Sequence, residues 1–295
     1  MDRRQFGLAA AALALVAATP AWAKDAGFVS NRLTMTVEGS GRDVILVPGL
    51  TSSPDAWRTA TPKLPGYRYH YVQVKGFAGT AAEGNAAGGL IAGVAEEIAR
   101  YIRDAKLTKP AIVGHSMGGT VALMVAARHP ELVGRVMVVD QLPFMGMMFG
   151  PPGSTAESLK PVADDIQKKM DARSDAENEQ ALAAMMGPMV ANEALRPKVL
   201  QQAVASDRKV VTATFHELIV TDLRPELTKI SVPATVLYVT PRGVQVTDAQ
   251  VDEIYKASYA NLKGVKLIRV PNAAHFIMFD NTDGFISELK TFLTA

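Results

Sequence analysis

Short apolar runs alternate along the chain with longer segments in which apolar residues recur every three or four positions. Seven runs have the length and composition of strands: 33–37, 43–47, 69–74, 110–113, 135–139, 234–239 and 265–270. Helical spacing is clearest over 89–107, with apolar residues at Leu90, Val94, Ile98 and Ile102. Further helices are predicted at 54–64, 117–128, 248–260 and from 280 to the end. This alternation predicts a mostly parallel sheet with right-handed crossovers and an α/β fold.

One long segment interrupts the alternation. Residues 141–229 contain four helical stretches and no convincing strand, and the helices are expected at 156–170, 175–186, 192–205 and 209–221. We therefore expect an α/β core formed by residues 24–140 and 230–295, with residues 141–229 inserted as an all-helical cap.

Composition narrows the possible functions. With 48% hydrophobic and 20% charged residues the chain is globular, and its length of 295 residues suits one α/β domain with an insertion. A net charge of +2 without a dense basic run disfavours a nucleic-acid partner. The absence of Cys excludes a cysteine nucleophile, disulfides and thiolate metal sites. Only 5 His, with no HxxxH pair, disfavour a histidine-rich metal site, so no metal is expected.

The first 23 residues read as an export signal. Arg3 and Arg4 precede an apolar stretch at 7–18, and a small-x-small site at 21–23 ends the segment. The apolar stretch is shorter than the roughly 20 residues that a membrane-spanning helix needs. We therefore expect no stable membrane insertion and a mature chain that is periplasmic or secreted. The paired arginines resemble the twin-arginine export signature, and an ordinary signal peptide is the alternative.

The sequence Gly114-His115-Ser116-Met117-Gly118 directly follows a predicted strand and directly precedes a predicted helix. A sharp strand-to-helix turn leaves no room for side chains at 114 and 118, which explains both glycines. Such a turn would expose the Ser116 hydroxyl at a helix N-terminus, where developing negative charge is favoured. Ser116 is the candidate nucleophile. The alternative is a glycine-rich turn with a passive serine.

Four motifs together resemble the α/β-hydrolase superfamily, in its branch with a helical cap: LVPGL at 46–50, GHSMG at 114–118, DLR at 222–224 before Val232-Pro233, and AHF at 274–276. The resemblance implies a triad of serine, acid and a late histidine. It also implies an oxyanion hole formed by the backbone N–H groups of Leu50 and Met117. Pro48-Gly49 stands where an HG dipeptide is common, and the glycine of that turn is kept.

His275 is the candidate base. It follows the last predicted strand, in a loop that can bring an imidazole over the carboxyl edge of the sheet, where Ser116 is expected. A serine hydroxyl needs such a proton acceptor to become nucleophilic. We expect a structural role for His115 and a surface role at a helix end for His129.

Two residues are candidates for the acid. Many relatives carry it just after the strand that corresponds to 234–239, but here the loop holds no carboxylate before Asp248. Asp140 ends the strand that follows the helix predicted at 117–128, and a strand end is rigid enough to orient an imidazole. We favour Asp140, with Asp248 as the alternative acid. A third possibility is that Asp140 only binds nearby backbone.

The segment after Asp140 suggests the character of the substrate. Phe144, Met145 and Met148 are candidate substrate-binding residues, since methionine and phenylalanine form adaptable apolar walls. The alternative is that they pack the core of the helical segment.

The sequence thus predicts a serine esterase that acts, without a cofactor, on a small or medium-sized apolar ester as its small-molecule partner. A lactonase, an aminopeptidase or a carbon–carbon bond hydrolase could use the same residues. A non-catalytic binding protein of the same fold is the alternative from another class. The oligomeric state is not encoded in any recognisable pattern.

Overall fold

The computed structural model describes residues 23–24 and 27–294. The predicted export signal, residues 1–23, lies outside these residues except for Ala23, so export stays a prediction. In the described part of the chain, no helix combines the length and the apolar character needed to cross a bilayer.

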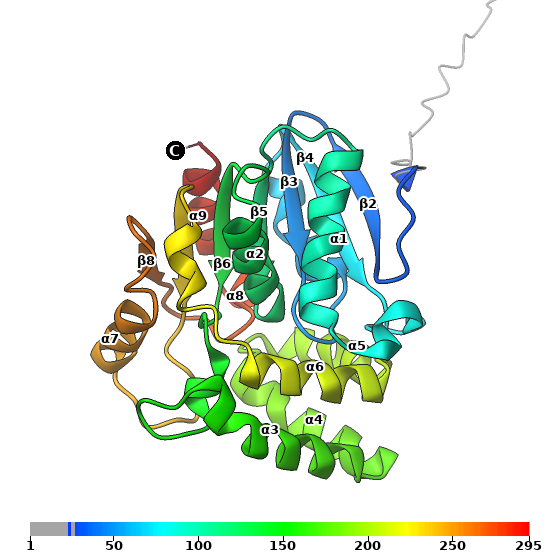
Figure 1. Ribbon diagram of the computed structural model, residues 1–295, viewed down its shortest axis with the longest axis vertical. Helices are drawn as coiled ribbons and strands as arrows, with labels where there is room; N and C mark the ends of the chain where they lie inside the picture. Colours follow the sequence, from blue (N-terminus) through cyan, green and yellow to red (C-terminus); the bar gives the residue numbers. More distant parts are fainter. Residues whose placement is uncertain (1–22, 25–26, 295) are drawn as a thin grey trace, which may run out of the picture.

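The described residues form one eight-stranded sheet, with strands in the order β1-β2-β4-β3-β5-β6-β7-β8 (Figure 1). Their bounds are β1 (Ala23–Lys24), β2 (Leu33–Gly39), β3 (Arg42–Val47), β4 (Tyr67–Val74), β5 (Ala111–His115), β6 (Arg135–Val139), β7 (Ala234–Tyr238) and β8 (Lys266–Arg269). Strand β2 runs antiparallel to both β1 and β4, and all other neighbouring strands are parallel. The predicted mostly parallel α/β sheet is confirmed.

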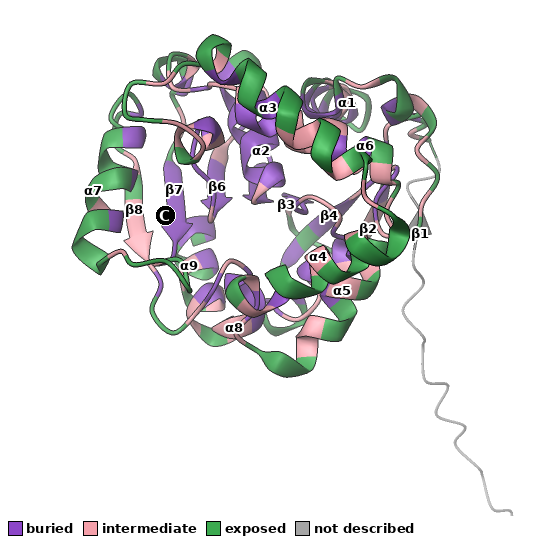
Figure 2. Cartoon of the chain, turned by 90° about the horizontal axis from the view of Figure 1, so that it is seen from below, coloured by how far each residue is buried: buried purple, intermediate pink, exposed green. Residues whose placement is uncertain are grey.

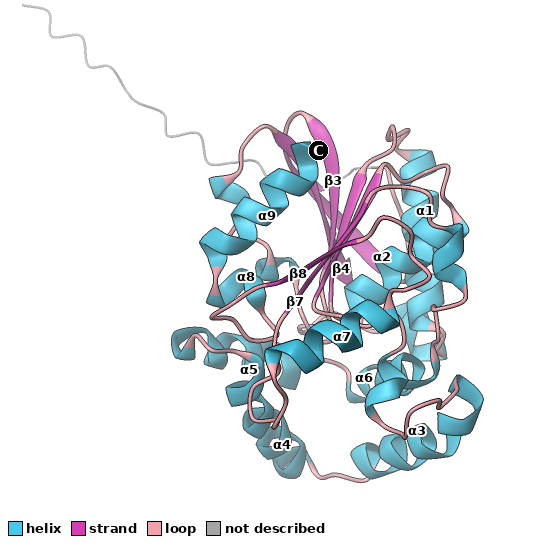
Figure 3. Ribbon diagram, turned by 90° about the vertical axis from the view of Figure 1, so that its left-hand side faces the viewer, coloured by secondary structure: helices cyan, strands magenta, loops and turns pink. Residues whose placement is uncertain are grey.

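Helices cover both faces of the sheet, which is why the central strands are apolar throughout. On one face, Ile45 and Val47 share a core with α1 (Leu90–Asp104), α2 (Met117–Arg128) and α7 (Asp248–Ser258). On the other, Val44 and Leu46 pack with α8 (Ile277–Asp280) and α9 (Thr282–Thr294), and Figure 3 separates these two layers.

One helix prediction, at 54–64, is wrong. Residues 54–64 form two short 3₁₀ turns, η1 (Pro54–Ala56) and η2 (Thr61–Lys63), with a proline in the first turn of each. A proline lacks the N–H that a continuous helix would need, so the segment breaks. The helix predicted from about 280 to the end is confirmed as α9, and the short helix α8 precedes it, separated by Asn281 with a φ of −131°.

Four helices connect β6 to β7: α3 (Ala156–Asp171), α4 (Asp175–Met189), α5 (Arg196–Val204) and α6 (Arg208–Val220). No strand occurs within 141–229, all of which the structure describes. Helix α3 pairs with α6 and α4 pairs with α5 (Figure 3). These helices expose much of their surface, whereas α2 and the central strands are almost entirely buried (Figure 2).

The helical segment contacts the carboxyl edge of the sheet. Glu217 of α6 accepts hydrogen bonds from the N–H groups of Leu90 and Ile91 at 3.1 and 3.0 Å. These are the first residues of α1, so a carboxylate lies at a helix N-terminus, where its charge is favourable. Since α1 follows β4, α6 lies at the edge of the sheet where the parallel strands end.

Candidate active site

Ser116 occupies a strained strand-to-helix turn, the elbow, between β5 and α2. Its φ of 52° and ψ of −125° lie outside the regions that non-glycine residues prefer, a conformation that costs about 1–3 kcal/mol. A Cβ on Gly114 would lie 2.0 Å from the carbonyl oxygen of Gly118, and one on Gly118 would lie 2.2 Å from that of Val47. The expected steric need for both glycines is therefore present in the structure.

His275 and Asp140 are joined by a hydrogen bond of 2.7 Å between Nδ1 and Oδ2. Asp140 follows β6 directly and has a φ of 52°, and its N–H is bonded to the carbonyl oxygen of Leu237 at 2.7 Å. The Ser116 N–H is bonded to the carbonyl oxygen of Val139 at 2.9 Å, which sets the elbow beside the end of β6. The sequence-predicted serine, histidine and first-choice acid are thus brought together at one edge of the sheet.

Asp248, the alternative acid, binds residues other than His275. Its Oδ1 accepts a hydrogen bond from the Thr240 hydroxyl at 2.5 Å, and its Oδ2 pairs with Arg269 at 2.6 Å. Its side chain is 59% exposed, against 12% for Asp140. The geometry therefore favours Asp140 over Asp248 as the partner of His275.

His115 links the elbow to the histidine loop. Its buried ring lies 4.6 Å from the ring of His275, and Nε2 lies 2.9 Å from the His275 carbonyl oxygen. Burial, and then the nearby charge of His275, lower the pKa of His115 well below its usual value, so the ring is neutral. Because a carbonyl only accepts, Nε2 carries the proton and donates it. This contact agrees with the structural role expected for His115.

His129 lies at the end of α2, where its ring contacts Glu96 at 3.0 Å. Its backbone N–H closes the helix on the carbonyl oxygen of Val125. This is the position that the sequence indicated.

The two residues expected to supply oxyanion donors belong to segments that adjoin Ser116. Met117 is the first residue of α2, and Leu50 follows Gly49 in the loop after β3. A Cβ on Gly49 would lie 3.1 Å from the Ser116 Cβ, so this loop passes directly beside the elbow. Within the described part of the chain the Ser116 hydroxyl makes no hydrogen bond, and catalytic contacts are often longer before substrate binds.

The candidate substrate-binding residues differ in exposure. Phe144 is fully buried with Leu159, Ala163 and Ile219, and the Arg224 guanidinium stands 4.6 Å from its ring centre. This environment favours the packing interpretation for Phe144. Met145 is partly buried, and Met148 is 67% exposed. Their contact with substrate stays a prediction.

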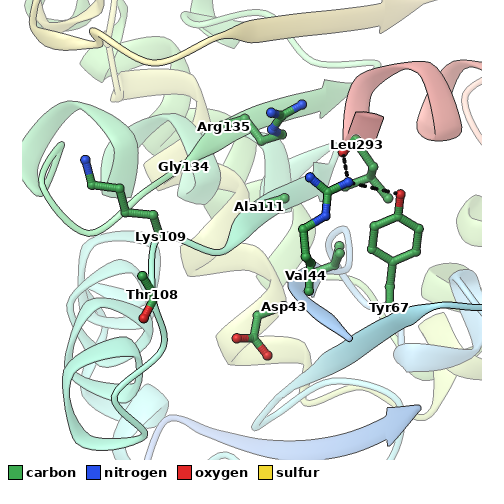
Figure 4. A pocket seen from close by; sticks show the side chains of 10 residues that line it. Asp43, Val44, Tyr67, Thr108, Lys109, Ala111, Gly134, Arg135 and Leu293 are labelled. Carbon is green, nitrogen blue, oxygen red and sulfur yellow. Dashed lines mark hydrogen bonds between the residues drawn. The ribbon is translucent and has the colours of Figure 1, made fainter. Parts of the chain in front are cut away.

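A cavity of about 350 Å³ lies at the opposite edge of the sheet (Figure 4). It is lined by Arg42, Ala111 and Arg135, the first residues of β3, β5 and β6, whereas Ser116 follows the last residue of β5. Arg42 and Arg135 donate to the last carbonyl groups of α9. This cavity is therefore not part of the Ser116 site. Among the described residues, no group of three His, Cys, Asp or Glu side chains could hold a metal ion.

Comparisons with known proteins give a consistent assignment. The model of the alpha/beta hydrolase family matches residues 44–288. A pimeloyl-[acyl-carrier protein] methyl ester esterase from Aliivibrio fischeri is 28% identical over 272 residues, which covers 90% of this chain and 98% of the relative. The enzyme of the same name from Vibrio cholerae is 28% identical over 263 residues, or 88% and 96% of the two chains.

Two solved structures share the fold over most of their length. An esterase from Exiguobacterium antarcticum superposes with a TM-score of 0.74 at 21% identity, over 89% of this chain and 96% of the other. An enol-lactonase from Burkholderia xenovorans does so with a TM-score of 0.70 at 20% identity and the same coverage. At these identities the likeness concerns the fold alone.

Proposed function

Because the chain belongs to the alpha/beta hydrolase family, we propose that it is a serine hydrolase that cleaves carboxylic esters through an acyl-enzyme. The observation that carries the proposal is the bond between His275 and Asp140 beside the Ser116 elbow. The curated relatives, similar along nearly their whole length, are named as methyl ester esterases, which supports an ester as the substrate.

The proton path follows from the hydrogen bonds. A carboxylate only accepts, so in the neutral ring Nδ1 of His275 carries the proton that Asp140 binds. This leaves the lone pair on Nε2 free to take the proton of Ser116 as its oxygen attacks the ester carbonyl. Asp140 then stabilises the imidazolium, which returns the proton to the departing alcohol. Water then attacks the acyl-enzyme: His275 takes a proton from the water and returns it to the Ser116 oxygen as the carboxylic acid leaves.

The negatively charged oxygen of the tetrahedral intermediate needs hydrogen-bond donors to stabilise it. We assign this task to the N–H groups of Leu50 and Met117, which belong to the loop after β3 and to the start of α2. The N-terminal end of the α2 dipole favours the same negative charge.

The helical segment bears on substrate choice. We assign residues 24–140 and 230–295 to the catalytic core and residues 141–229 to a cap over it, since α6 is bonded to the start of α1 at the carboxyl edge. Methionines in this segment, among them Met145 and Met148, favour an apolar acyl group of small or medium size.

A panel of esters tests this proposal. The purified protein is assayed on chromogenic esters of graded acyl length, on methyl esters of the same acids and on a lactone, with Ser116→Ala as the control. We expect hydrolysis that depends on acyl length and is lost in the control. Activity confined to the lactone, or activity that survives Ser116→Ala, would contradict the assignment.

The location is a separate proposal. Arg3 and Arg4 before the apolar stretch support export to the periplasm or medium by the twin-arginine route. Replacing both by lysine keeps the charge but removes the signature, so export should stop. Normal export of the double variant, measured by cell fractionation, would overturn this route.

A further inference from the structure

The Asp140 carboxylate uses its two oxygens for different purposes. Oδ2 contacts His275, whereas Oδ1 accepts two hydrogen bonds, each of 3.2 Å, from the Val239 backbone N–H and the Tyr255 hydroxyl. Asp140 follows β6, Val239 follows β7 and Tyr255 belongs to α7. Two donors from different parts of the fold therefore bind Oδ1, the carboxylate oxygen that is not bonded to His275.

Tyr255 is suited to act as a permanent donor. Its side chain is buried, and burial, followed by the charge of Asp140, raises the pKa of its hydroxyl well above the usual value. The phenol therefore stays protonated and donates rather than accepts.

The ring that carries this hydroxyl is held on both sides. Tyr238 of β7 stacks on it with ring centres 4.0 Å apart and an angle of 14°, and Tyr259 lies nearly parallel at 6.3 Å. The hydroxyl of Tyr238 instead donates to Asp252 at 2.9 Å, and that of Tyr259 donates to the Gln141 carbonyl oxygen at 2.7 Å. Of the three stacked tyrosines, Tyr255 alone reaches the Asp140 carboxylate.

We propose that Tyr255 is a positioning residue of the active site: its hydroxyl fixes the orientation of the Asp140 carboxylate and moderates the pull of that carboxylate on the His275 proton. The inference rests on the proposed function, since it assigns a role within the same triad. It adds a residue that touches neither the substrate nor the reacting atoms.

Removing the hydroxyl should have two separable effects. The carboxylate would keep a single donor on Oδ1 and would be held less firmly in its orientation beside His275, so kcat should fall, by about tenfold, while KM changes little. The remaining negative charge would also be less stabilised and would attract the imidazolium more strongly. The acid limb of the pH profile should therefore move upward, by about half a pH unit.

Tyr255→Phe tests this, because it keeps the ring and the stack and removes only the hydroxyl. Tyr238→Phe is the matched control, since it removes a hydroxyl from the same stack without touching Asp140. For both variants and the wild type we would measure the rate of Ser116 labelling by a fluorophosphonate across the pH range in which histidine titrates, and then kcat and KM on the best ester. Melting temperatures and the proton NMR signal of His275 Nδ1–H report folding and the hydrogen bond independently of turnover.

The expected result is slower labelling, an upward-shifted acid limb and a changed Nδ1–H signal in Tyr255→Phe alone. A Tyr255→Phe protein with wild-type rates and pH profile would overturn the inference. So would equal losses in both variants without a shift of the acid limb, which would indicate that only the stack matters. A wild-type protein that does not react at Ser116 would instead refute the proposed function itself.

Discussion

His115 donates a hydrogen bond from its Nε2 to the backbone carbonyl oxygen of His275 at 2.9 Å. Since Ser116 follows His115 directly, this contact ties the elbow to the loop of the base. The other ring nitrogen, Nδ1, is buried and has no hydrogen-bond partner among the described residues. The His115 side chain therefore holds the backbone of the His275 loop beside the elbow.

Replacing His115 by phenylalanine should test this tie. The ring and its contact with Phe276 would remain, but the His275 carbonyl would lose its donor, at a cost of about 1–3 kcal/mol in unfolding free energy. Because the pKa of His115 is far below its usual value, the residue stays neutral, and the acid limb of activity should not disappear with it. Urea denaturation and a pH–rate profile measure the two quantities. Unchanged stability would show that the contact contributes nothing.

The two candidate acids can be separated by isosteric substitution. Asp140→Asn should keep the shape of the side chain but lose the charge that stabilises the imidazolium, so kcat should fall by up to about 10⁴. Asp248→Asn should change activity little, since its oxygens pair with Thr240 and Arg269. Steady-state kinetics on one ester decide between them, and the reverse ranking would rule out Asp140 as the acid.

Much of this fold follows from local pattern. The strand at 135–139 and the helix at 117–128 have the bounds that their apolar runs indicate, because buried parallel strands and the helix between them have strong periodic signals. The single helix predicted at 54–64 is wrong, because Pro62 lacks the N–H that a continuous helix needs and the segment forms two 3₁₀ turns instead.

The active site was harder to predict from the sequence than the fold. The elbow and His275 have local signatures, but the choice between Asp140 and Asp248 depends on where the loop after β7 runs and on a pairing with Arg269, 21 residues further on. Tyr255 was not identified at all. It lies four residues after Val251 and four before Tyr259 on the buried side of α7, and that spacing is the same for a packing residue as for one that contacts Asp140.

The tight packing of the elbow has a direct consequence. A Cβ on Gly118 would lie 2.2 Å from the carbonyl oxygen of Val47, a backbone atom that cannot turn aside. Gly118→Ala should therefore displace the start of α2, lower the melting temperature and abolish esterase activity. Gly187→Ala, also in a helix but with open space around it, is the control and should be harmless. A fully active Gly118→Ala protein would contradict the close approach.

A polar cluster at the opposite edge of the sheet should make stability depend on pH. Asp43 Oδ1 contacts Arg68 at 2.5 Å and His70 at 2.9 Å. Burial raises the pKa of Asp43, but the hydrogen bonds and charges of Arg68 and His70 outweigh it and lower the pKa below 3.8. A lowered folded-state pKa stabilises the protein above the ordinary value, and this contribution is lost as the pH falls through the folded-state value.

Asp43→Asn should accordingly lower the unfolding free energy at neutral pH, by about 1–3 kcal/mol. The difference from wild type should shrink as the pH falls below 3.8. Urea denaturation at several pH values measures it. A difference that is constant with pH would show that the charge of Asp43 is not responsible.

The central claim is that Ser116 is a nucleophile activated by His275, and covalent labelling tests it most directly. The wild-type protein is treated with a fluorophosphonate, and the modified residue is located by mass spectrometry, with Ser116→Ala and His275→Ala in parallel. We expect one adduct on Ser116, none in Ser116→Ala, and labelling slowed by several orders of magnitude in His275→Ala. A wild-type protein that remains unlabelled, or an adduct on another residue, would contradict the claim.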